Sequence, residues 1–162
     1  MLSNMKRTRL SNSANETKKI GQQFVARLLN KREKRGNALV FALEGELGSG
    51  KTIFVQGLAR GLGIKQTITS PTFILIRRYF LPRSFLTGKK QNDFRNFYHI
   101  DCYRLEKPWQ LQELEFNNII NDAGNIVAIE WADKIKQILP PDSIRIKFEL
   151  LTQEKRRIIF TN

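Results

Sequence analysis

The sequence predicts an α/β fold of three layers, in which a mainly parallel β-sheet lies between helices and carries an antiparallel C-terminal extension. Three short apolar runs are bounded by turn residues or end in an acid, as buried strands of a parallel sheet do: residues 38–43, 97–100 and 126–129. Segments with helical periodicity separate these runs. Two further runs, 144–150 and 156–161, flank a stretch at 151–154 that can close a hairpin.

The N-terminal region predicts a flexible basic leader followed by a helix. Residues 1–12 are basic and polar, and Ser13 and Glu16 then have the spacing of a capping box. Apolar residues recur every four positions from Ile20 to Leu28, which predicts an amphipathic helix. No apolar run follows the cations of the leader, so we expect no signal peptide and no membrane span, and a soluble cytoplasmic protein.

The other helices and the least regular segment follow from the same patterns. Residues 51–62 predict a helix directly after a glycine-rich loop, and residues 109–121 predict another. Residues 77–97 are strongly basic and are expected to form an insertion or a flexible loop. The length of 162 residues and the hydrophobic content of 41% fit one domain, which we place at residues 13–162.

The charge and cysteine content narrow the classes of partner and site. The 28 basic and 15 acidic residues give a net charge of +13. Such a balance indicates contact with a polyanion or an acidic protein, although a genome that favours lysine gives the same composition. The single cysteine, Cys102, excludes an internal disulfide and a multi-cysteine zinc site, and we interpret it as a small core residue.

A phosphate-binding motif follows the first apolar run. Residues 45–52, here called the phosphate loop, read G-E-L-G-S-G-K-T and match the pattern G-x-x-x-x-G-K-[ST], with a strand before and a helix after. The glycines allow backbone N–H groups to converge on an anion at a helix N-terminus. Lys51 can reach the outer phosphates, and the Thr52 hydroxyl can ligate Mg²⁺. The sequence therefore predicts a site for ATP and Mg²⁺.

Two acids are candidates for the second half of such a site. Asp101 and Glu130 each end an apolar run, and the carboxyl ends of parallel strands lie beside the phosphate loop in this kind of fold. A carboxylate there can hold the ion or position the attacking water. The spacing does not say which of the two acids contacts Mg²⁺ directly.

The combination of motifs resembles one family. The phosphate loop is followed by T-S-P-T-F at residues 69–73, H-I-D-C-Y-R-L at 99–105 and I-E-W at 129–131. In this order the motifs are similar to those of the TsaE (YjeE) family, the P-loop ATPases of bacterial tRNA threonylcarbamoyladenosine (t6A) synthesis. The resemblance covers roughly residues 13–161, and it implies the P-loop NTPase fold.

The resemblance implies a role for each matching residue. Lys51, Asp101 and Glu130 would be the catalytic residues, with Thr52 and Glu130 as the Mg²⁺ ligands. Residues 69–73 would form a switch-like loop near the γ-phosphate. The nucleotide would be bound by residues of the phosphate loop, by an early helix residue and by a tryptophan: Glu46, Leu47, Gly48, Ser49, Gly50, Lys51, Thr52, Thr17 and Trp131.

Three of the family positions carry alternatives or departures. Trp131 is equally well explained as a core aromatic, and His99 is better explained as a structural histidine than as a catalytic base. Cys102 stands where leucine is usual. The segment 77–97 is longer and more basic than the usual short acidic link, so it could touch tRNA or be a solvated insertion.

The resemblance also implies partners. Members of the family act with TsaD and TsaB, which transfer the threonylcarbamoyl group to an adenosine next to the anticodon. The TsaE-like protein would hydrolyse ATP on that pair, and only feebly when alone.

Two other classes of function remain open for a protein with the same phosphate loop. One is a small-molecule kinase, for which no acceptor motif is visible, and the other is a non-catalytic, nucleotide-gated RNA-binding switch, for which no aromatic stacking motif is evident.

Overall fold

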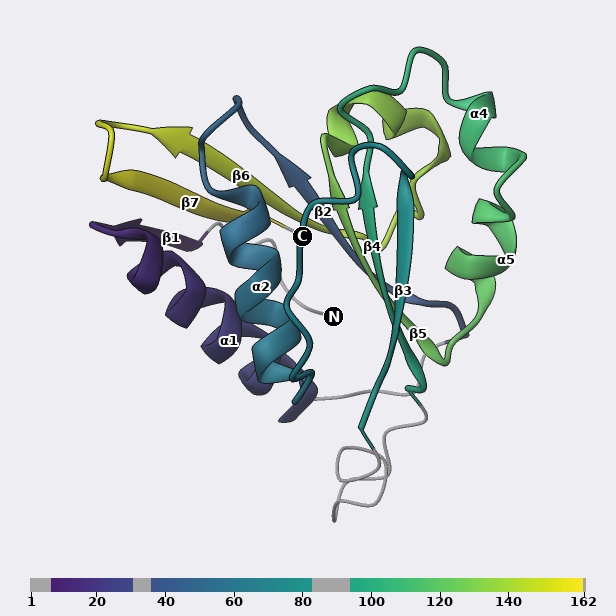
Figure 1. Cartoon of the computed structure of the whole chain (residues 1–162), viewed down its shortest axis with the longest axis horizontal. Helices are drawn as coiled ribbons and strands as arrows, with labels where there is room; N and C mark the ends of the chain where they lie inside the picture. The colour runs from purple at the N-terminus through teal and green to yellow at the C-terminus, as the bar shows by residue number, and fades with distance from the viewer. Residues whose placement is uncertain (1–6, 31–35, 83–93, 162) are drawn as a thin grey trace.

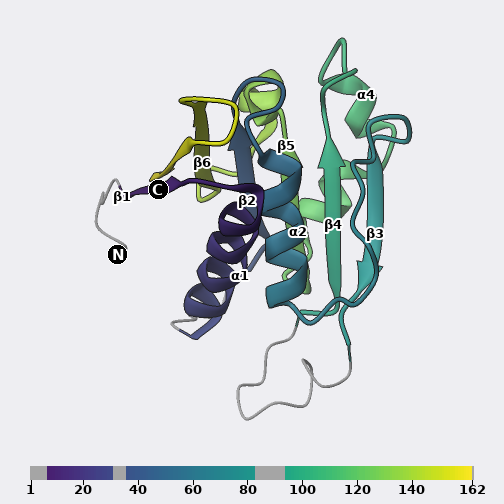
Figure 2. The same ribbon diagram turned by 60° about the vertical axis from the view of Figure 1, so that its left-hand side comes forward.

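A computed structural model describes residues 7–30, 36–82 and 94–161, and it shows one mixed sheet with helices packed on both faces (Figures 1 and 2). The strands are β1 (Arg7–Ser11), β2 (Leu39–Glu44), β3 (Ile76–Phe80), β4 (Asn96–Asp101), β5 (Asn125–Glu130), β6 (Ile144–Leu150) and β7 (Arg156–Thr161). The helices are α1 (Ala14–Asn30), α2 (Lys51–Gly61), α4 (Trp109–Gln112), α5 (Phe116–Asn121) and the 3₁₀ helix η1 (Ala132–Ile138).

The sheet is parallel at its centre and antiparallel at both edges. Its strand order is β1-β7-β6-β2-β5-β4-β3. Strands β6, β2, β5 and β4 run parallel to one another, whereas β7 is antiparallel to β6, β1 to β7, and β3 to β4. The predicted α/β class, the mainly parallel sheet and the antiparallel C-terminal hairpin are therefore confirmed.

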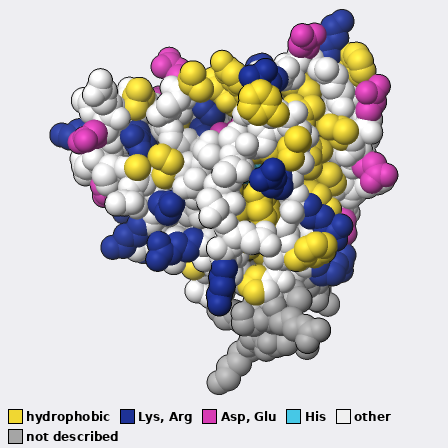
Figure 3. Space-filling model, viewed as in Figure 1, with side chains coloured by type: hydrophobic (Ala, Val, Ile, Leu, Met, Phe, Trp, Pro, Cys, Tyr) yellow, Lys and Arg dark blue, Asp and Glu magenta, His cyan; other side chains and the backbone are white. Residues whose placement is uncertain are grey.

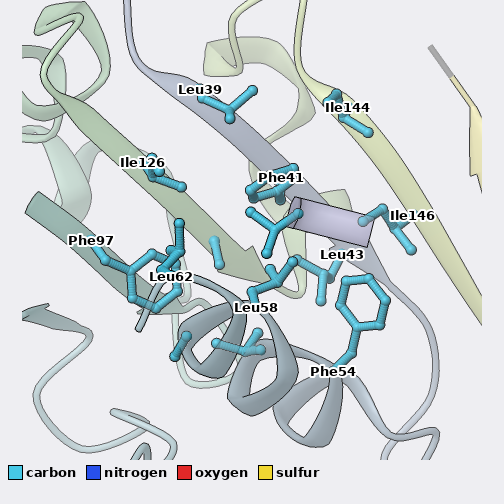
Figure 4. Packing of buried hydrophobic residues seen from close by; sticks show 14 of the residues in the cluster. Leu39, Phe41, Leu43, Phe54, Leu58, Leu62, Phe97, Ile126, Ile144 and Ile146 are labelled. Carbon is cyan, nitrogen blue, oxygen red and sulfur yellow. The ribbon is translucent and has the colours of Figure 1, made fainter. Parts of the chain in front are cut away.

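Two apolar cores hold the layers together, one on each face of the sheet. On one face, Leu39, Phe41 and Leu43 of β2 point toward α2, where they meet Phe54 and Leu58 (Figure 4). On the other face, the alternate residues of β2, β5 and β4 pack against α4, α5 and η1. Because β2 and β5 are buried on both faces, their sequences are continuously apolar rather than alternating.

Helices α1 and α2 cross at glycines. A Cβ on Gly57 of α2 would lie 2.1 Å from the carbonyl oxygen of Lys18, and a Cβ on Gly21 of α1 would lie 2.5 Å from that of Phe54. Both distances are shorter than any real contact, so the two backbones can approach this closely only where side chains are missing. The crossing fixes α1 against the helix that begins at the phosphate loop.

The prediction of a flexible leader at residues 1–12 is wrong for its second half. Residues 7–11 form β1, which pairs with β7 from Arg7 opposite Phe160 to Ser11 opposite Arg156. The strand lies at the edge of the sheet. Ser11 is buried, but its other four side chains are exposed, so its sequence lacks the apolar alternation that marks a strand. Residues 1–6 lie outside the described part.

The prediction of a basic insertion or loop at residues 77–97 is also partly wrong. Residues 76–80 form β3, an edge strand that pairs along its whole length with β4, and β4 itself begins at Asn96. Tyr79 is buried while Arg77, Arg78 and Phe80 are exposed, as expected of an edge strand with one covered position. Residues 83–93 lie outside the described residues.

The single helix predicted at residues 109–121 is broken into α4 and α5. Glu115 has a left-handed backbone (φ 58°) and separates them. Leu111 and Phe116 are both fully buried, but five residues of continuous helix would turn them about 140° apart. The break brings both side chains into the same core, and it leaves Leu114 41% exposed.

None of the helices in the described residues combines the length and the apolar character that a membrane span requires.

Candidate functional site

The phosphate loop joins the C-terminal end of β2 to the first turn of α2. A Cβ on Gly45 (φ 147°) would lie 2.5 Å from the carbonyl oxygen of Phe148 on β6, so only glycine can pass this close to the neighbouring strand. Gly50 (φ 98°) is the N-cap of α2 and turns the chain into the helix. The loop therefore ends at a helix N-terminus, where unpaired N–H groups and the helix dipole favour an anion.

Lys51 is buried at the mouth of this loop. Its Nζ donates hydrogen bonds to the carbonyl oxygens of Gly45 at 2.6 Å and Glu46 at 2.8 Å. It also lies 4.0 Å from the centre of the Trp131 ring. Burial lowers the pKa of Lys51, and the nearby carboxylates, Glu130 foremost, act in the opposite direction. The ammonium is thus held among acceptors at the place where the outer phosphates are predicted to bind.

Glu130 connects the phosphate loop to β4 through both of its carboxylate oxygens. The Thr52 hydroxyl donates to Oε2 at 2.9 Å, and His99 Nε2 lies 2.7 Å from Oε1. His99 and Glu130 are both buried, and His99 Nδ1 has no hydrogen-bond partner among the described residues. The imidazole proton therefore belongs on Nε2, where it donates to Glu130 and fixes the direction of the carboxylate.

Asp101 lies beside Glu130, because the two are register partners on the parallel strands β4 and β5. Its Oδ1 accepts the backbone N–H of Tyr103 at 2.9 Å. Its Oδ2 accepts hydrogen bonds from the hydroxyls of Thr72, at 2.6 Å, and Ser70. The second acid thus holds the loop of residues 69–73, which the resemblance identifies as switch-like.

The 69–73 loop presents an aromatic side chain to solvent. Phe73 is 83% exposed, and the Arg104 guanidinium lies 4.3 Å from the centre of its ring. Leu47, at the tip of the phosphate loop, is 72% exposed. The candidate site is therefore rimmed by two large apolar side chains that are mostly exposed.

A buried arginine belongs to the site and is absent from the sequence prediction. Arg156 Nη1 donates to the Thr17 hydroxyl at 3.1 Å, and the Ser11 hydroxyl lies 2.8 Å from the same Thr17 oxygen. A Cβ on Gly50 would lie 3.5 Å from Arg156 Nε, an atom without a hydrogen-bond partner in the described residues. The signal was present, since alternation along β7 places Arg156 on the same face as the buried Ile158.

The structure brings most of the predicted residues into one place. Lys51, Thr52, Asp101, Glu130 and Trp131 meet around the mouth of the phosphate loop through the contacts given above. Thr17 is connected to the same loop through Arg156, which lies beside Gly50. Ser49 is buried within the loop, whereas three predicted nucleotide-binding residues lie exposed at its outer turn: Glu46, Leu47 and Gly48.

Cys102 stays outside this constellation. It is fully buried, and burial raises the pKa of its thiol to about 12. A thiol that remains protonated is a poor nucleophile, so the interpretation of Cys102 as a core residue agrees with its surroundings.

Together the sheet order, the glycine-rich loop before α2 and the acids at the ends of neighbouring parallel strands define a protein of the P-loop NTPase-like α/β class. The comparisons with known proteins narrow this class. Residues 11–158 match the family model described as threonylcarbamoyl adenosine biosynthesis protein TsaE. The chain belongs to the TsaE family, which takes part in tRNA threonylcarbamoyladenosine biosynthesis.

Individual relatives and a solved structure agree with this family. The chain is 35% identical over 146 residues to a TsaE protein of Rickettsia prowazekii, covering 90% of this chain and 88% of the relative. It is 35% identical over 149 residues to that of Treponema pallidum, covering 92% and 96%. The crystal structure of YdiB from Bacillus subtilis is similar with a TM-score of 0.67 and 26% identity, covering 99% of this chain and 88% of that one.

Proposed function

We propose that this chain binds ATP and Mg²⁺ on the phosphate loop and hydrolyses ATP as an accessory ATPase of t6A modification next to the tRNA anticodon. One arrangement carries the proposal. Thr52 lies within hydrogen-bond distance of Glu130, and Asp101 is beside Glu130 on the next strand, so a hydroxyl and two carboxylates converge on the end of the phosphate loop. The family membership agrees with this reading.

The donor set fits magnesium. Mg²⁺ prefers oxygen ligands and usually takes only one or two carboxylates, with water and substrate phosphates completing its shell. Among the described residues there is no group of three or more His, Cys, Asp or Glu side chains that could hold a metal without such help. Thr52 and Glu130 would hold the ion, which neutralises phosphate charge when bound, and Asp101 is the alternative or additional ligand.

The chain's own residues supply the rest of the proposed site. The backbone N–H groups of the phosphate loop and the Lys51 ammonium would bind the phosphates. Asp101 would accept a hydrogen bond from an attacking water, and His99 would keep Glu130 oriented. The Nε–H of Arg156 lies beside Gly50 and has no hydrogen-bond partner in the described part of the chain, so we assign Arg156, with Thr17, to the nucleotide side of the loop.

A protein partner would complete this site. The exposed apolar rim of Leu47 and Phe73 is typical of a contact surface, and Phe73 belongs to the loop that Asp101 holds. We therefore propose TsaD together with TsaB as the partners, and a weak turnover in their absence.

The deciding experiment is Mg²⁺-dependent ATP turnover by the purified chain, measured alone and with TsaB and TsaD from the same source. We expect strong stimulation by the pair. Lys51→Ala should lose triphosphate affinity as well as turnover, because it removes the cation at the loop mouth. Glu130→Ala should lose about 100-fold or more in turnover while it retains much of the nucleotide binding. Equal and weak turnover with and without the pair would contradict the accessory role.

The described residues contain nothing that specifically favours the small-molecule kinase. Three arginines of the sequence, Arg77, Arg78 and Arg83, could imitate a kinase lid. Arg77 and Arg78 donate instead to Thr69 and Asn96 within the domain, and Arg83 lies outside the described residues.

A further inference from the structure

The excess positive charge is concentrated on one side of the molecule. No acid occurs in residues 17–30 or in residues 51–82, which together form α1 after its first turn, all of α2, the connection that follows it, and β3. Five exposed cations stand on this side, here called the basic face: Lys19, Arg27, Arg60, Lys65 and Arg77. Figure 3 shows basic side chains across this view, with acidic ones toward its upper and side margins.

The cations of the basic face are not neutralised. Within the part of the chain that the structure describes, none of the five pairs with a carboxylate. On the opposite face of the sheet, four exposed cations pair with acids, although Arg78 and Lys134 form no ion pair among the described residues. There Lys136 and Arg145 lie 3.9 and 3.8 Å from Glu44, and Lys147 and Arg157 lie 3.0 and 3.1 Å from Glu149.

The absence of acids separates a binding surface from a general bias in composition. A genome that favours lysine adds cations to every face, but it does not remove the acids from two long stretches that fold together. Unpaired, exposed cations spread over one face create a field that attracts a polyanion. Three of the five are arginines, whose planar guanidinium matches the geometry of phosphate.

The edge of the sheet adds a feature typical of nucleic-acid binding. The Arg78 guanidinium lies 4.5 Å from the centre of the Phe80 ring, and Phe80 is 71% exposed. Tyr79 between them packs into the core under α1 and α2, so Arg78 and Phe80 point to the other face of the sheet and stand at the margin of the basic face. Exposed aromatic and guanidinium planes are what unpaired RNA bases stack on, whereas an acidic protein needs only the charges. No aromatic stacking motif was evident in the sequence, because Phe80 stands out only once β3 is seen to be an edge strand.

We propose that the basic face binds the phosphate backbone of RNA, with tRNA as the substrate class that fits the pathway of the family. The surface is broader than the segment 77–97 that the sequence suggested. In that segment Arg95 pairs with Asp122 at 2.9 Å, and the main cations lie on α1, α2 and the turn after it. Arg77 also donates to Thr69, so the basic face adjoins the 69–73 loop of the nucleotide site.

The test compares two variants of the full chain with the same net charge. In the first variant, glutamine replaces four cations of the basic face: Lys19, Arg27, Arg60 and Lys65. In the second variant, glutamine replaces four paired cations of the opposite face: Lys136, Arg145, Lys147 and Arg157. Affinity for fluorescently labelled tRNA is measured by anisotropy over a range of KCl concentrations. Neither set includes a residue of the nucleotide site, so ATP affinity serves as the check on folding.

We expect the basic-face variant to lose about 10-fold or more in tRNA affinity, and its salt slope to fall by about one for each lost phosphate contact. The opposite-face variant should bind like the original chain. Phe80→Ala should weaken binding of tRNA but not of heparin, which has no bases. Equal losses of tRNA affinity in both quadruple variants would overturn the proposal. It would also be overturned if the original chain bound no tRNA, or if it bound an unstructured acidic polypeptide as tightly as tRNA. None of these outcomes depends on ATP turnover.

Discussion

At the scale of single residues, the candidate site depends on how one carboxylate is oriented. Glu130 accepts from Thr52 on one oxygen and from His99 on the other, and both Glu130 and His99 are buried. His99 faces the carboxylate rather than the mouth of the phosphate loop. This geometry agrees with a positioning residue, and it disfavours the catalytic base that the H-x-D motif also allows.

His99→Leu should raise the Mg²⁺ concentration at which nucleotide binding is half-maximal, because Glu130 loses the donor that fixes its direction. Loss of such a partner typically costs about 10- to 100-fold in metal affinity. The measurement is a Mg²⁺ titration of the affinity for a fluorescent ATP analogue. His99→Gln, which keeps a donor near the same place, is the matched control and should recover most of the affinity. An unchanged Mg²⁺ midpoint in the leucine variant would refute the positioning role.

At the scale of elements, the crossing of α1 and α2 decides where the nucleotide site stands relative to the sheet. Gly21 and Gly57 let the two helices touch along their backbones, and the apolar face of α2 then packs on β2. The intrinsic helix propensity of α2 is lowered by Gly57. Close packing thus outweighs local preference at this position.

Gly57→Ala should destabilise the domain, since its Cβ would need to occupy the position of the Lys18 carbonyl group and the helices would separate. Overpacking of this kind costs about 1–3 kcal/mol in the free energy of unfolding, measurable by urea denaturation. Gly36→Ala provides the control, because a Cβ there meets nothing within 4 Å. If both variants unfold at the same urea concentration as the original chain, the crossing is not as close as the structure shows.

At the scale of the whole molecule, the seven-stranded sheet connects the N-terminal strand to the site. β1 pairs with β7, and Ser11 at its end contacts Thr17, which in turn accepts from Arg156 beside Gly50. A segment that looked like a leader is therefore part of the scaffold. The same edge position explains its arginines, because charged side chains on an edge strand oppose pairing between molecules.

Removal of residues 1–11 should lower both stability and nucleotide affinity. The deletion takes away the hydrogen bonds of β1 and the Ser11 hydroxyl, and we expect a loss of about 1–3 kcal/mol in the free energy of unfolding. Thermal unfolding and binding of a fluorescent ATP analogue report the two effects. A chain that begins at Arg7 and retains the whole of β1 is the comparison. Identical behaviour of the two truncated chains would contradict a structural role for β1.

The sequence by itself determined the buried centre of this protein and most of its candidate site. Continuous apolar runs marked β2, β4 and β5, and a local motif marked the phosphate loop, because burial on both faces and tight glycine turns leave strong signals in a short stretch of chain. The acids at the strand ends followed from the same runs.

Only the tertiary structure decided the edges of the sheet, the break at Glu115 and the place of Arg156. Edge strands are half exposed, so their apolar pattern is weak, and their partners lie far away in the sequence. The break in the helix depends on two side chains that share one core. The gathering of two acid-free stretches on one face likewise depends on the packing of distant segments, which composition does not record.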